Sequence, residues 1–417
     1  MNEIKHGDSL EVLEQLEPNS VHAVITDPPY GLAFMGRDWD DFEPKEYQEW
    51  CQEWAEKAKQ VLKPGGHLLA FSGNRTHHRL FTGVEDAGFE IRDTLTWHYG
   101  SGFPKASDIS KTIDKRADAE REQVEVDLPD HLDGGAYQDG SGDKSESDAT
   151  SYYTGTNATK SIPATDAAKT WDGWKTGLKP ATEFIVMARK PYDGATVDSV
   201  LENGTAALNI EACRVGGDVD TTRPDGPNNP EIYGPQTNDN RGSEHGGRYP
   251  ANVIFDEVAA GALDRKVGES ESTSGRTGSA GFGANDNVYG DNGGEISNDR
   301  GFDDKGGPSR YFYTSKASKA ERTENGSIDN SHPTVKPIDL MEWLIKLVTK
   351  EEQIVLDPFA GSGTTCKAAK GLNRQFIGIE KQAKWADIAR VRCGLTPDDP
   401  SVVRDDDGQE GLEAYSD

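Results

Sequence analysis

The chain has 417 residues, which suits one large domain or two modest ones. Its 73 Asp and Glu residues against 45 Lys and Arg residues give a formal net charge of −28, an unusual balance for a nucleic-acid-binding protein, because phosphate binding relies on Lys and Arg. The four cysteines form no CxxC pair, which excludes a disulfide framework and a zinc ribbon, and we expect no metal. The sequence has no signal pattern and no apolar run near ~18 residues. These features predict a soluble cytoplasmic protein with no membrane partner.

The first hundred residues alternate between apolar runs and amphipathic stretches, as in a compact α/β fold. Residues 21–26 form a short apolar run that stops at an Asp-Pro-Pro sequence, which predicts a buried parallel strand followed by a turn. Apolar positions at helical spacing predict a helix over 47–62, and two further apolar runs predict strands over 67–71 and 95–99.

The middle of the chain has a different composition. Ten acidic residues stand against two basic ones between Glu120 and Asp148, a balance that favours a solvated or disordered insert. An apolar run at 184–188 predicts another strand, whereas residues 216–309 are rich in Gly, Asn, Asp and Ser and predict loops.

Regular structure returns near the end of the chain, with a helix predicted over 338–349 and strands over 354–356 and 375–379. Strands that alternate with helices at both ends predict one parallel sheet whose halves are separated in sequence by an insertion. Neighbouring strands at the switch point of a doubly wound sheet direct their following loops into one crevice, so we expect the loops after residues 26 and 356 to meet.

The acidic surplus is not confined to the insert and to an acidic tail at 397–417, but is spread along the chain. This distribution predicts a halophilic protein, because near 1 M salt the screening length falls to roughly 3 Å and acidic side chains repel one another less. A generic acidic surface is the alternative interpretation.

A Gly-rich turn at Asp357-Pro-Phe-Ala-Gly361-Ser-Gly363-Thr-Thr follows a predicted strand and opens a helix. Glycines let the backbone approach a ligand closely, and a helix N-terminus offers free N–H groups. The turn is not the dinucleotide fingerprint, because Cys366 stands where the third glycine would fall, and no GK[ST] of a P-loop follows it. Glu380 ends the next strand, where a carboxylate can accept hydrogen bonds from a ribose diol. The pattern favours a nucleoside with a small tail, and an ordinary structural turn is the alternative.

A second motif, Asp27-Pro28-Pro29-Tyr30, follows the first buried strand. The Asp27 carboxylate and the Pro28 carbonyl can accept both hydrogens of an exocyclic amino group, and the Tyr30 ring can stack on the attached base. An Asp-Pro turn without function is the alternative. Further along, residues 310–322 carry four basic residues against one acid, interleaved with aromatics, so they could follow a DNA backbone or form a solvated basic patch.

Together these motifs resemble those of the S-adenosylmethionine-dependent amino DNA methyltransferases. DPPY at 27–30 is similar to their catalytic motif and FAGSG at 359–363 to their cofactor motif, and this order resembles the circularly permuted beta class. The resemblance covers residues 1–100, 184–190 and 332–390. It implies an α/β fold with a doubly wound, mostly parallel seven-stranded methyltransferase sheet and a loop-rich inserted target-recognition region.

The resemblance also implies how the chain is divided. The expected segments are a catalytic half over 1–100, an acidic and partly disordered insert over 101–180, a returning sheet strand over 181–190, a target-recognition region over 191–330, a cofactor-binding half over 331–396, and an acidic disordered tail over 397–417.

Site residues follow from the same motifs. The catalytic set is Asp27, Pro28, Pro29 and Tyr30. The residues expected to bind S-adenosylmethionine are Asp8, Lys336, Asp357, Phe359, Gly361, Gly363, Thr364 and Glu380, with Lys336 either meeting the methionine carboxylate or only capping the loop. The residues expected to meet the target base or DNA are Asn74, Trp97, Arg310, Lys316 and Lys319.

The implied reaction moves a methyl group from S-adenosylmethionine to the exocyclic N6 of an adenine flipped out of double-stranded DNA. DPPY accompanies adenine more often and SPPY cytosine N4 in this family, so cytosine N4 is the alternative. RNA or protein-glutamine methylation and a DNA-binding regulator without turnover are weaker alternatives. Methylation at cytosine carbon five is excluded, because none of the four cysteines follows a proline. A cognate restriction endonuclease, and a monomeric or homodimeric state, are left open.

Overall fold

The computed structural model describes residues 2–32, 42–102, 106–126, 158–216, 247–271, 305–315 and 335–402, together with residues 323–324, 327–328, 330 and 332. The chain forms two compact units. The larger unit comprises residues 1–101 and 181–417, and the smaller unit comprises residues 102–180.

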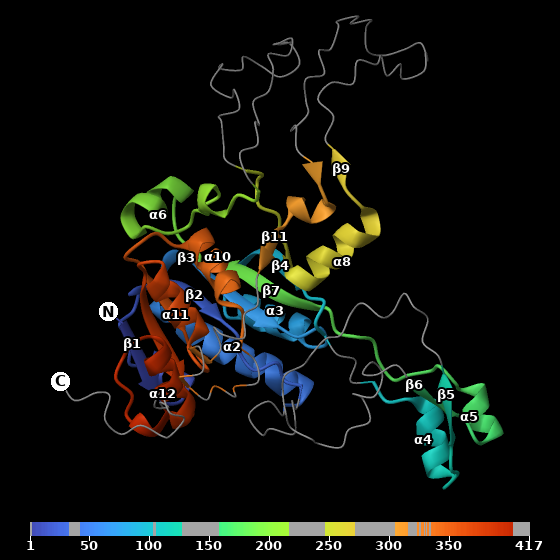
Figure 1. Ribbon diagram of the computed structural model, residues 1–417. Coiled ribbons are helices and arrows are strands. Elements are labelled where there is room, and N and C mark those ends of the chain that lie inside the picture. Colours follow the sequence, from blue (N-terminus) through green and yellow to red (C-terminus); the bar gives the residue numbers. More distant parts are fainter. Residues whose placement is uncertain are drawn as a thin grey trace, which may run out of the picture. The chain divides into compact units, whose positions relative to one another are not determined.

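A nine-stranded sheet forms the centre of the larger unit (Figure 1). Its strands, in spatial order, are β1 (Asn2–His6), β13 (Gln375–Glu380), β12 (Ile354–Asp357), β2 (Val21–Thr26), β3 (Leu62–Ser72), β7 (Thr182–Arg189), β4 (Glu90–His98), β8 (Val253–Asp256) and β11 (Tyr313–Ser315). All neighbouring pairs are parallel except those of β7, which runs antiparallel to β3 and β4. The predicted α/β class and mostly parallel sheet are therefore confirmed.

Two strands exceed the seven that were expected, and both come from the region predicted to be loops. β8 has four residues and β11 has three, too few for a recognisable alternation in sequence. They extend the sheet because β8 pairs with the free edge of β4 and β11 then pairs with β8. A second difference lies in β3, which begins directly after the preceding helix at Leu62 and accommodates Pro64-Gly65-Gly66 through a register shift against β2.

Helices cover both faces of the sheet, because successive strand residues point to opposite sides. On β2, Ala23 and Ile25 face one apolar core, which α10 (Ile338–Val348), α11 (Thr364–Gly371) and α12 (Ala383–Arg392) complete. Val24 faces the other core, which α1 (Ser9–Leu13), α2 (Pro44–Val61) and α3 (His77–Asp86) complete. Among the residues that the structure describes, the larger unit also contains the α-helices α6 (Thr196–Asn203) and α8 (Glu257–Val267).

The smaller unit contains α4 (Ile109–Arg116), the antiparallel pair β5 (Glu122–Val126) and β6 (Ala158–Ile162), and α5 (Asp166–Thr170). Its centre is Asp114, which is buried and accepts hydrogen bonds from the backbone and hydroxyl of Thr165 and from Arg121. Part of the insert that was expected to be acidic and partly disordered is thus folded. Most of the acidic run at 120–148, and the tail beyond residue 402, lie outside the described residues.

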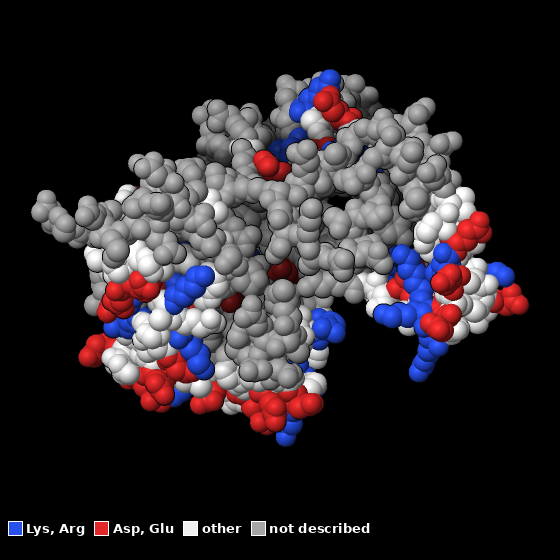
Figure 2. Space-filling view, turned by 60° about the horizontal axis from the view of Figure 1, so that its bottom comes forward, with Lys and Arg blue, Asp and Glu red and all other residues white. Residues whose placement is uncertain are grey.

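The surface carries charges of both signs. Figure 2 shows Asp and Glu side chains interspersed with Lys and Arg over the described part of this face. The predicted adaptation to high salt stays a prediction.

Candidate active site

Two loops begin side by side at one edge of the sheet. β2 and β12 are adjacent and parallel, and the Thr26 hydroxyl at the end of β2 donates a 2.6 Å hydrogen bond to Asp357 at the end of β12. Along the chain these residues are 331 positions apart. The predicted meeting of the loops after residues 26 and 356 is confirmed, and it occurs where the strand order changes direction.

The loop after β2 is held in a fixed shape by α2. The Tyr47 hydroxyl donates a 2.9 Å hydrogen bond to the Pro29 carbonyl oxygen. Gly31 has φ +64°, and a Cβ at this position would lie 2.7 Å from the Tyr47 ring. Only glycine suits such a backbone and such contact, so the Asp27–Tyr30 segment is placed by backbone constraints.

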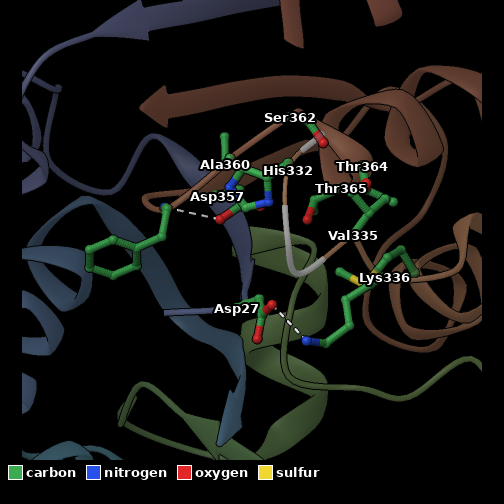
Figure 3. A pocket seen from close by; sticks show the side chains of 12 residues that line it. Asp27, His332, Val335, Lys336, Asp357, Ala360, Ser362, Thr364 and Thr365 are labelled. Atoms are coloured by element: carbon green, nitrogen blue, oxygen red, sulfur yellow. Dashed lines mark hydrogen bonds and ion pairs between the residues drawn. The ribbon is translucent and has the colours of Figure 1, made fainter. Parts of the chain in front are cut away.

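Asp27 lies within a network of four polar side chains. The Tyr30 hydroxyl is 2.7 Å from Asp27 Oδ1, and the Lys336 ammonium is 2.6 Å from Asp27 Oδ2 (Figure 3). Glu183, at the start of β7, completes the network, with its Oε2 3.0 Å from the Tyr30 hydroxyl and 3.3 Å from the Lys336 ammonium. Lys336 is only 8% exposed, and its ammonium also lies over the Phe71 ring.

Burial and neighbouring charges shift the pKa values in this network. Burial raises the pKa of Glu183 above its usual value, with the Asp27 carboxylate adding to the effect. The pKa of Tyr30 is raised well above its usual value by burial and by both carboxylates. For Lys336, burial opposes the charged form, but Asp27 and Glu183 outweigh it and raise the pKa. In this network, one ammonium group therefore interacts with two carboxyl groups, those of Asp27 and Glu183.

The loop after β12 has the backbone that its glycines predict. Gly361 has φ +52° and Gly363 has φ +81°, both in the left-handed region. A Cβ on Gly361 would lie 3.1 Å from the His332 ring, and one on Gly363 would lie 2.8 Å from Ala389 Cβ. Gly363 caps the N-terminus of α11, so free helical N–H groups point to the crevice.

Glu380 and Asp8 lie beyond this loop, at the ends of the next two strands. Glu380 Oε2 accepts a 3.0 Å hydrogen bond from the Gly361 N–H, and burial raises the pKa of this carboxyl. Asp8 follows β1, accepts a 3.0 Å hydrogen bond from the Leu10 N–H at the start of α1, and is 3.0 Å from the ammonium of Lys381. Because His6 pairs with Glu380 across the sheet, the two carboxyl groups come from neighbouring strand ends.

Asp357 organises the same loop from within. Its carboxyl is 3% exposed, and its Oδ1 accepts hydrogen bonds from the Thr26 hydroxyl and from the Phe359 N–H. Burial raises the pKa of Asp357 to about 6. The Phe359 ring packs against Trp50 and Trp54 of α2, with ring centroids 5.4 and 5.5 Å away.

α12 supports the loop from the other side. The Arg392 guanidinium donates to the Ser362 carbonyl at 2.7 Å and to the Thr364 hydroxyl at 3.1 Å, and its side chain is fully buried. Glu324 neutralises this buried cation at 3.4 Å. The Thr364 hydroxyl accepts from Arg392 and keeps its own hydrogen to donate, and Thr364 lines the pocket, so its predicted role in cofactor binding stays a prediction.

A pocket lies between the two loops (Figure 3). Asp27, His332, Val335, Lys336 and Met341 line part of it, and Asp357, Phe359, Ala360, Gly361, Ser362, Thr364 and Thr365 line the rest. The combination of free helix N–H groups, two strand-end carboxyls and glycines that admit close backbone approach suits a nucleoside with a charged amino-acid tail. Asp27 adds an acceptor for an amino group at the rim.

Other predicted residues have different surroundings. Asn74 is exposed in the loop after β3, and Trp97 on β4 is partly buried and donates to the Ser315 hydroxyl at 3.3 Å. Arg310 binds its own chain, through the Gly307 carbonyl at 2.9 Å and by lying over the Tyr311 ring, so much of its donor capacity is used. Lys316 and Lys319 lie outside the described residues.

Glu183 and Arg392 were not found from the sequence. Glu183 begins an antiparallel strand, and the start of such a strand lies at the same edge as the ends of its parallel neighbours. This topological rule would have identified it. Arg392 carried no comparable signal, because basic residues are common in the last turn of a helix.

Within the residues that the structure describes, no group of three or more His, Cys, Asp or Glu side chains is arranged to hold a metal ion. In the same part of the chain, no helix has both the length and the apolar composition that crossing a bilayer requires.

Comparisons with known proteins agree with this geometry. A family model described as DNA methylase (N6_N4_Mtase) matches residues 21–391. The chain is 25% identical over 432 residues to the Type II methyltransferase M.HindIII of Haemophilus influenzae, covering 94% of this chain and 95% of that one. It is 52% identical over 61 residues to the Type II methyltransferase M2.DpnII of Streptococcus pneumoniae, a match that covers 15% of this chain and 23% of that one.

Solved structures resemble the chain more loosely. The cytosine-N4-specific PvuII DNA methyltransferase aligns with a TM-score of 0.43 at 15% identity, covering 94% of this chain and 86% of that one. The M1.HpyAVI–SAM complex aligns with a TM-score of 0.39 at 16% identity, covering 95% and 100%. At these scores the likeness carries no argument about function.

Proposed function

This chain belongs to the N6/N4 DNA methylase family, and on that premise we propose that it transfers a methyl group from S-adenosylmethionine to the exocyclic N6 of an adenine flipped out of double-stranded DNA. The observation that carries the proposal is the position of Asp27. Its carboxyl lines the same pocket as the Gly361–Gly363 turn, so an amino group held by Asp27 would lie next to a ligand held by that turn.

The residues present fit S-adenosylmethionine, which when bound supplies a methyl group on a positively charged sulfur. We assign the ribose diol to Glu380 and the adenine ring to Asp8, which come from the ends of the neighbouring strands β13 and β1. The N–H groups at the start of α11 suit the carboxylate of the methionine part. Lys336, for which the same carboxylate was one expectation, here pairs with Asp27, so we assign it to the target side of the pocket.

For the target base, Asp27 and the Pro28 carbonyl hold the amino group and orient the nitrogen lone pair toward the methyl group. Tyr30 and Trp97 offer aromatic surface for the extruded base, and Asn74 lies in a loop at the same edge. Catalysis of this kind rests on positioning and on electrostatic stabilisation of the positive charge that develops on nitrogen.

The order of the two loops along the chain, with Asp27 before Gly361, supports assignment to the circularly permuted beta class. We further propose that residues 191–330 contain the target-recognition region, to which β8 and β11 provide a rigid base at the edge of the sheet. Adenine is preferred because the motif is DPPY rather than SPPY. Cytosine N4 is the second candidate, since Asp27 can accept hydrogen bonds from either exocyclic amino group.

Expression in a methylation-free host, followed by single-molecule sequencing of the host DNA, tests the proposal. Parallel assays of purified protein on the same DNA at 0.1 M and at about 2 M KCl guard against misfolding in dilute salt. N6-methyladenine at a fixed sequence, present with the wild type and missing with Asp27→Ala, supports the proposal. N4-methylcytosine in place of N6-methyladenine would support the second candidate, cytosine N4 methylation. Unmodified DNA from the wild type under both salt conditions would contradict the proposed function.

A further inference from the structure

A polar network extends behind Asp27, and positioning of the target amino group uses only part of it. The Tyr30 hydroxyl lies between Asp27 and Glu183, so Glu183 is further from the pocket than Asp27. Glu183 is linked to Asp27 through Tyr30 and through Lys336. Its side chain is 18% exposed. A carboxyl group that is costly to bury in its charged form, and that does not touch the proposed ligands, requires a different explanation.

The protons available to the network limit how it is bonded. A tyrosine hydroxyl can donate one hydrogen bond and accept others, whereas an ammonium group can only donate. Tyr30 has Asp27 at 2.7 Å, Glu183 at 3.0 Å and Lys336 at 3.2 Å, so it accepts from Lys336 and donates to one carboxylate. The other carboxylate accepts from Lys336, and a proton on that carboxyl group would allow it to donate to the Tyr30 hydroxyl. Tyr30 is therefore a bridge across which one proton can belong to either carboxyl group.

Methyl transfer to an amino group produces such a proton. The nitrogen lone pair forms the new N–CH₃ bond, the S–CH₃ bond breaks with its electrons going to sulfur, and the nitrogen is left with one hydrogen too many. Asp27, which holds the amino group, is the nearest acceptor. Asp27 Oδ1 lies 2.7 Å from the Tyr30 hydroxyl, which in turn lies 3.0 Å from Glu183 Oε2, so a proton taken up by Asp27 has a path to Glu183.

We propose that Glu183 is the final protein acceptor of this proton: Asp27 takes it from nitrogen, and the Tyr30 hydroxyl gives its own proton to Glu183 Oε2 while receiving the one from Asp27. The inference rests on the proposed function. Charge is conserved at each stage. Before transfer, two ionised carboxylates balance Lys336 and the positive sulfur. After transfer, the sulfur and Glu183 are both neutral, and Asp27 balances Lys336.

The groups that face Glu183 fit this role. Asp27 and Tyr30 come from the loop after β2, Lys336 precedes α10, and Tyr99 follows β4. Burial, followed by the Glu183 carboxylate, raises the pKa of Tyr99 to about 12, and burial with the Asp27 and Glu183 carboxylates raises the pKa of Tyr30 well above its usual value, so both tyrosines stay neutral. Burial raises the pKa of Glu183 itself, which allows it to hold a proton that Asp27 releases.

Calorimetry provides a test that does not depend on turnover. S-adenosylmethionine and its product S-adenosylhomocysteine differ in the charge on sulfur, so binding the cationic form should expel a proton from Glu183. Titrations in buffers of different ionisation enthalpy between pH 5.5 and 8 should show greater proton release with S-adenosylmethionine than with the product. Glu183→Gln should remove this difference, and Glu342→Gln on α10 should preserve it. A difference that persists in Glu183→Gln would overturn the inference.

Single-turnover methylation measured against pH provides the second test. The wild-type rate should rise with pH as Glu183 ionises and then level off. Glu183→Gln should lower the plateau about 10²-fold and flatten the profile, with affinity for S-adenosylmethionine retained. Tyr30→Phe keeps the ring but interrupts the bridge, so it should reproduce the flattened profile while keeping the calorimetric proton release.

These outcomes separate the two proposals. A wild type that methylates DNA, with variants that keep its pH profile, overturns the role of Glu183 alone. A wild type that methylates no DNA contradicts the proposed function. If Glu183→Gln does not fold, as judged by circular dichroism, the pH profile of Tyr30→Phe decides the matter.

Discussion

Asp27 follows β2 and Asp357 ends β12, and because these strands are adjacent and parallel, the two carboxyl groups lie at the same edge of the sheet. Their partners differ. Asp27 lies 2.6 Å from an ammonium group, whereas Asp357 accepts from the Thr26 hydroxyl and a backbone N–H, both neutral donors. The side chain of Asp27 is 17% exposed, and Asp357 is 3% exposed.

The difference shows that a position at a strand end does not by itself define a role. The Lys336 ammonium pairs with one carboxylate oxygen of Asp27, and carboxylate oxygens are the atoms that would accept hydrogen bonds from an amino group. Neutral donors around Asp357 hold the loop backbone, and burial leaves the carboxyl with a pKa of about 6. On the proposed function, Asp27 would hold the target amino group, and Asp357 shapes the loop proposed to hold the cofactor.

The largest expected effect comes from removing the ligand-facing aspartate. Asp27→Ala should reduce methyl transfer about 10²–10³-fold or more, as expected when a preorganised hydrogen-bonding group is lost, with cofactor affinity nearly unchanged. Methylation assays and calorimetric titration with S-adenosylmethionine measure the two quantities. Asp86→Ala, on the exposed surface of α3, serves as the matched control. If cofactor binding fell together with activity in Asp27→Ala, the proposed difference between the roles of Asp27 and Asp357 would be wrong.

A smaller effect is expected at the cofactor side of the pocket. Glu380→Ala should weaken S-adenosylmethionine binding by about 1.5–3 kcal/mol, roughly 10–100-fold, because the ribose diol and the Gly361 N–H both lose a charged acceptor. Saturating cofactor should restore most of the rate. Glu380→Gln keeps an acceptor for the Gly361 N–H, so its affinity should lie between those of the wild type and the alanine variant. Equal losses in the two variants would contradict a role for the charge.

Removing the cation that distinguishes Asp27 from Asp357 should make the two sites alike. Lys336→Met leaves Asp27 and Glu183 without their ammonium partner, so negative charge on these two carboxyl groups should destabilise the fold. We expect a loss of about 2 kcal/mol near neutral pH, below the range for a fully buried pair because both carboxyls are partly exposed. The loss should shrink as pH falls and both carboxyls become neutral. Thermal unfolding of Lys336→Met and of the control variant Lys346→Met at several pH values measures this loss of stability. A loss that is constant with pH, or that grows as pH falls, would contradict the prediction.

The sequence predicted the two loops and their meeting, but not what surrounds them. DPPY and the Gly-rich turn are local patterns, and each follows an apolar run that is recognisable by itself. The network depends on contacts between residues that are 309 positions apart for Asp27 and Lys336 and 153 apart for Tyr30 and Glu183, and no local pattern encodes such contacts. Composition likewise identified the insert as acidic, yet could not distinguish Asp114, whose buried carboxyl organises the smaller unit, from solvated acids.

The smallest effect concerns the structural aspartate and its dependence on pH. The folded-state pKa of Asp357, about 6, lies above the value of 3.8 for an unperturbed carboxyl, so between these values the folded chain holds a proton that the unfolded chain has lost. The stability that the neutral form contributes is present at low pH and is lost as pH rises through about 6. Asp357→Asn cannot ionise, so its melting temperature relative to that of the wild type should increase by about 2–4 °C between pH 4 and pH 7 and then stay constant. Differential scanning calorimetry of both proteins across this range measures the change. A melting-temperature difference that is constant with pH would show that folding does not shift the pKa of Asp357, and one that decreases as pH rises would show that Asp357 is stabilised as an anion.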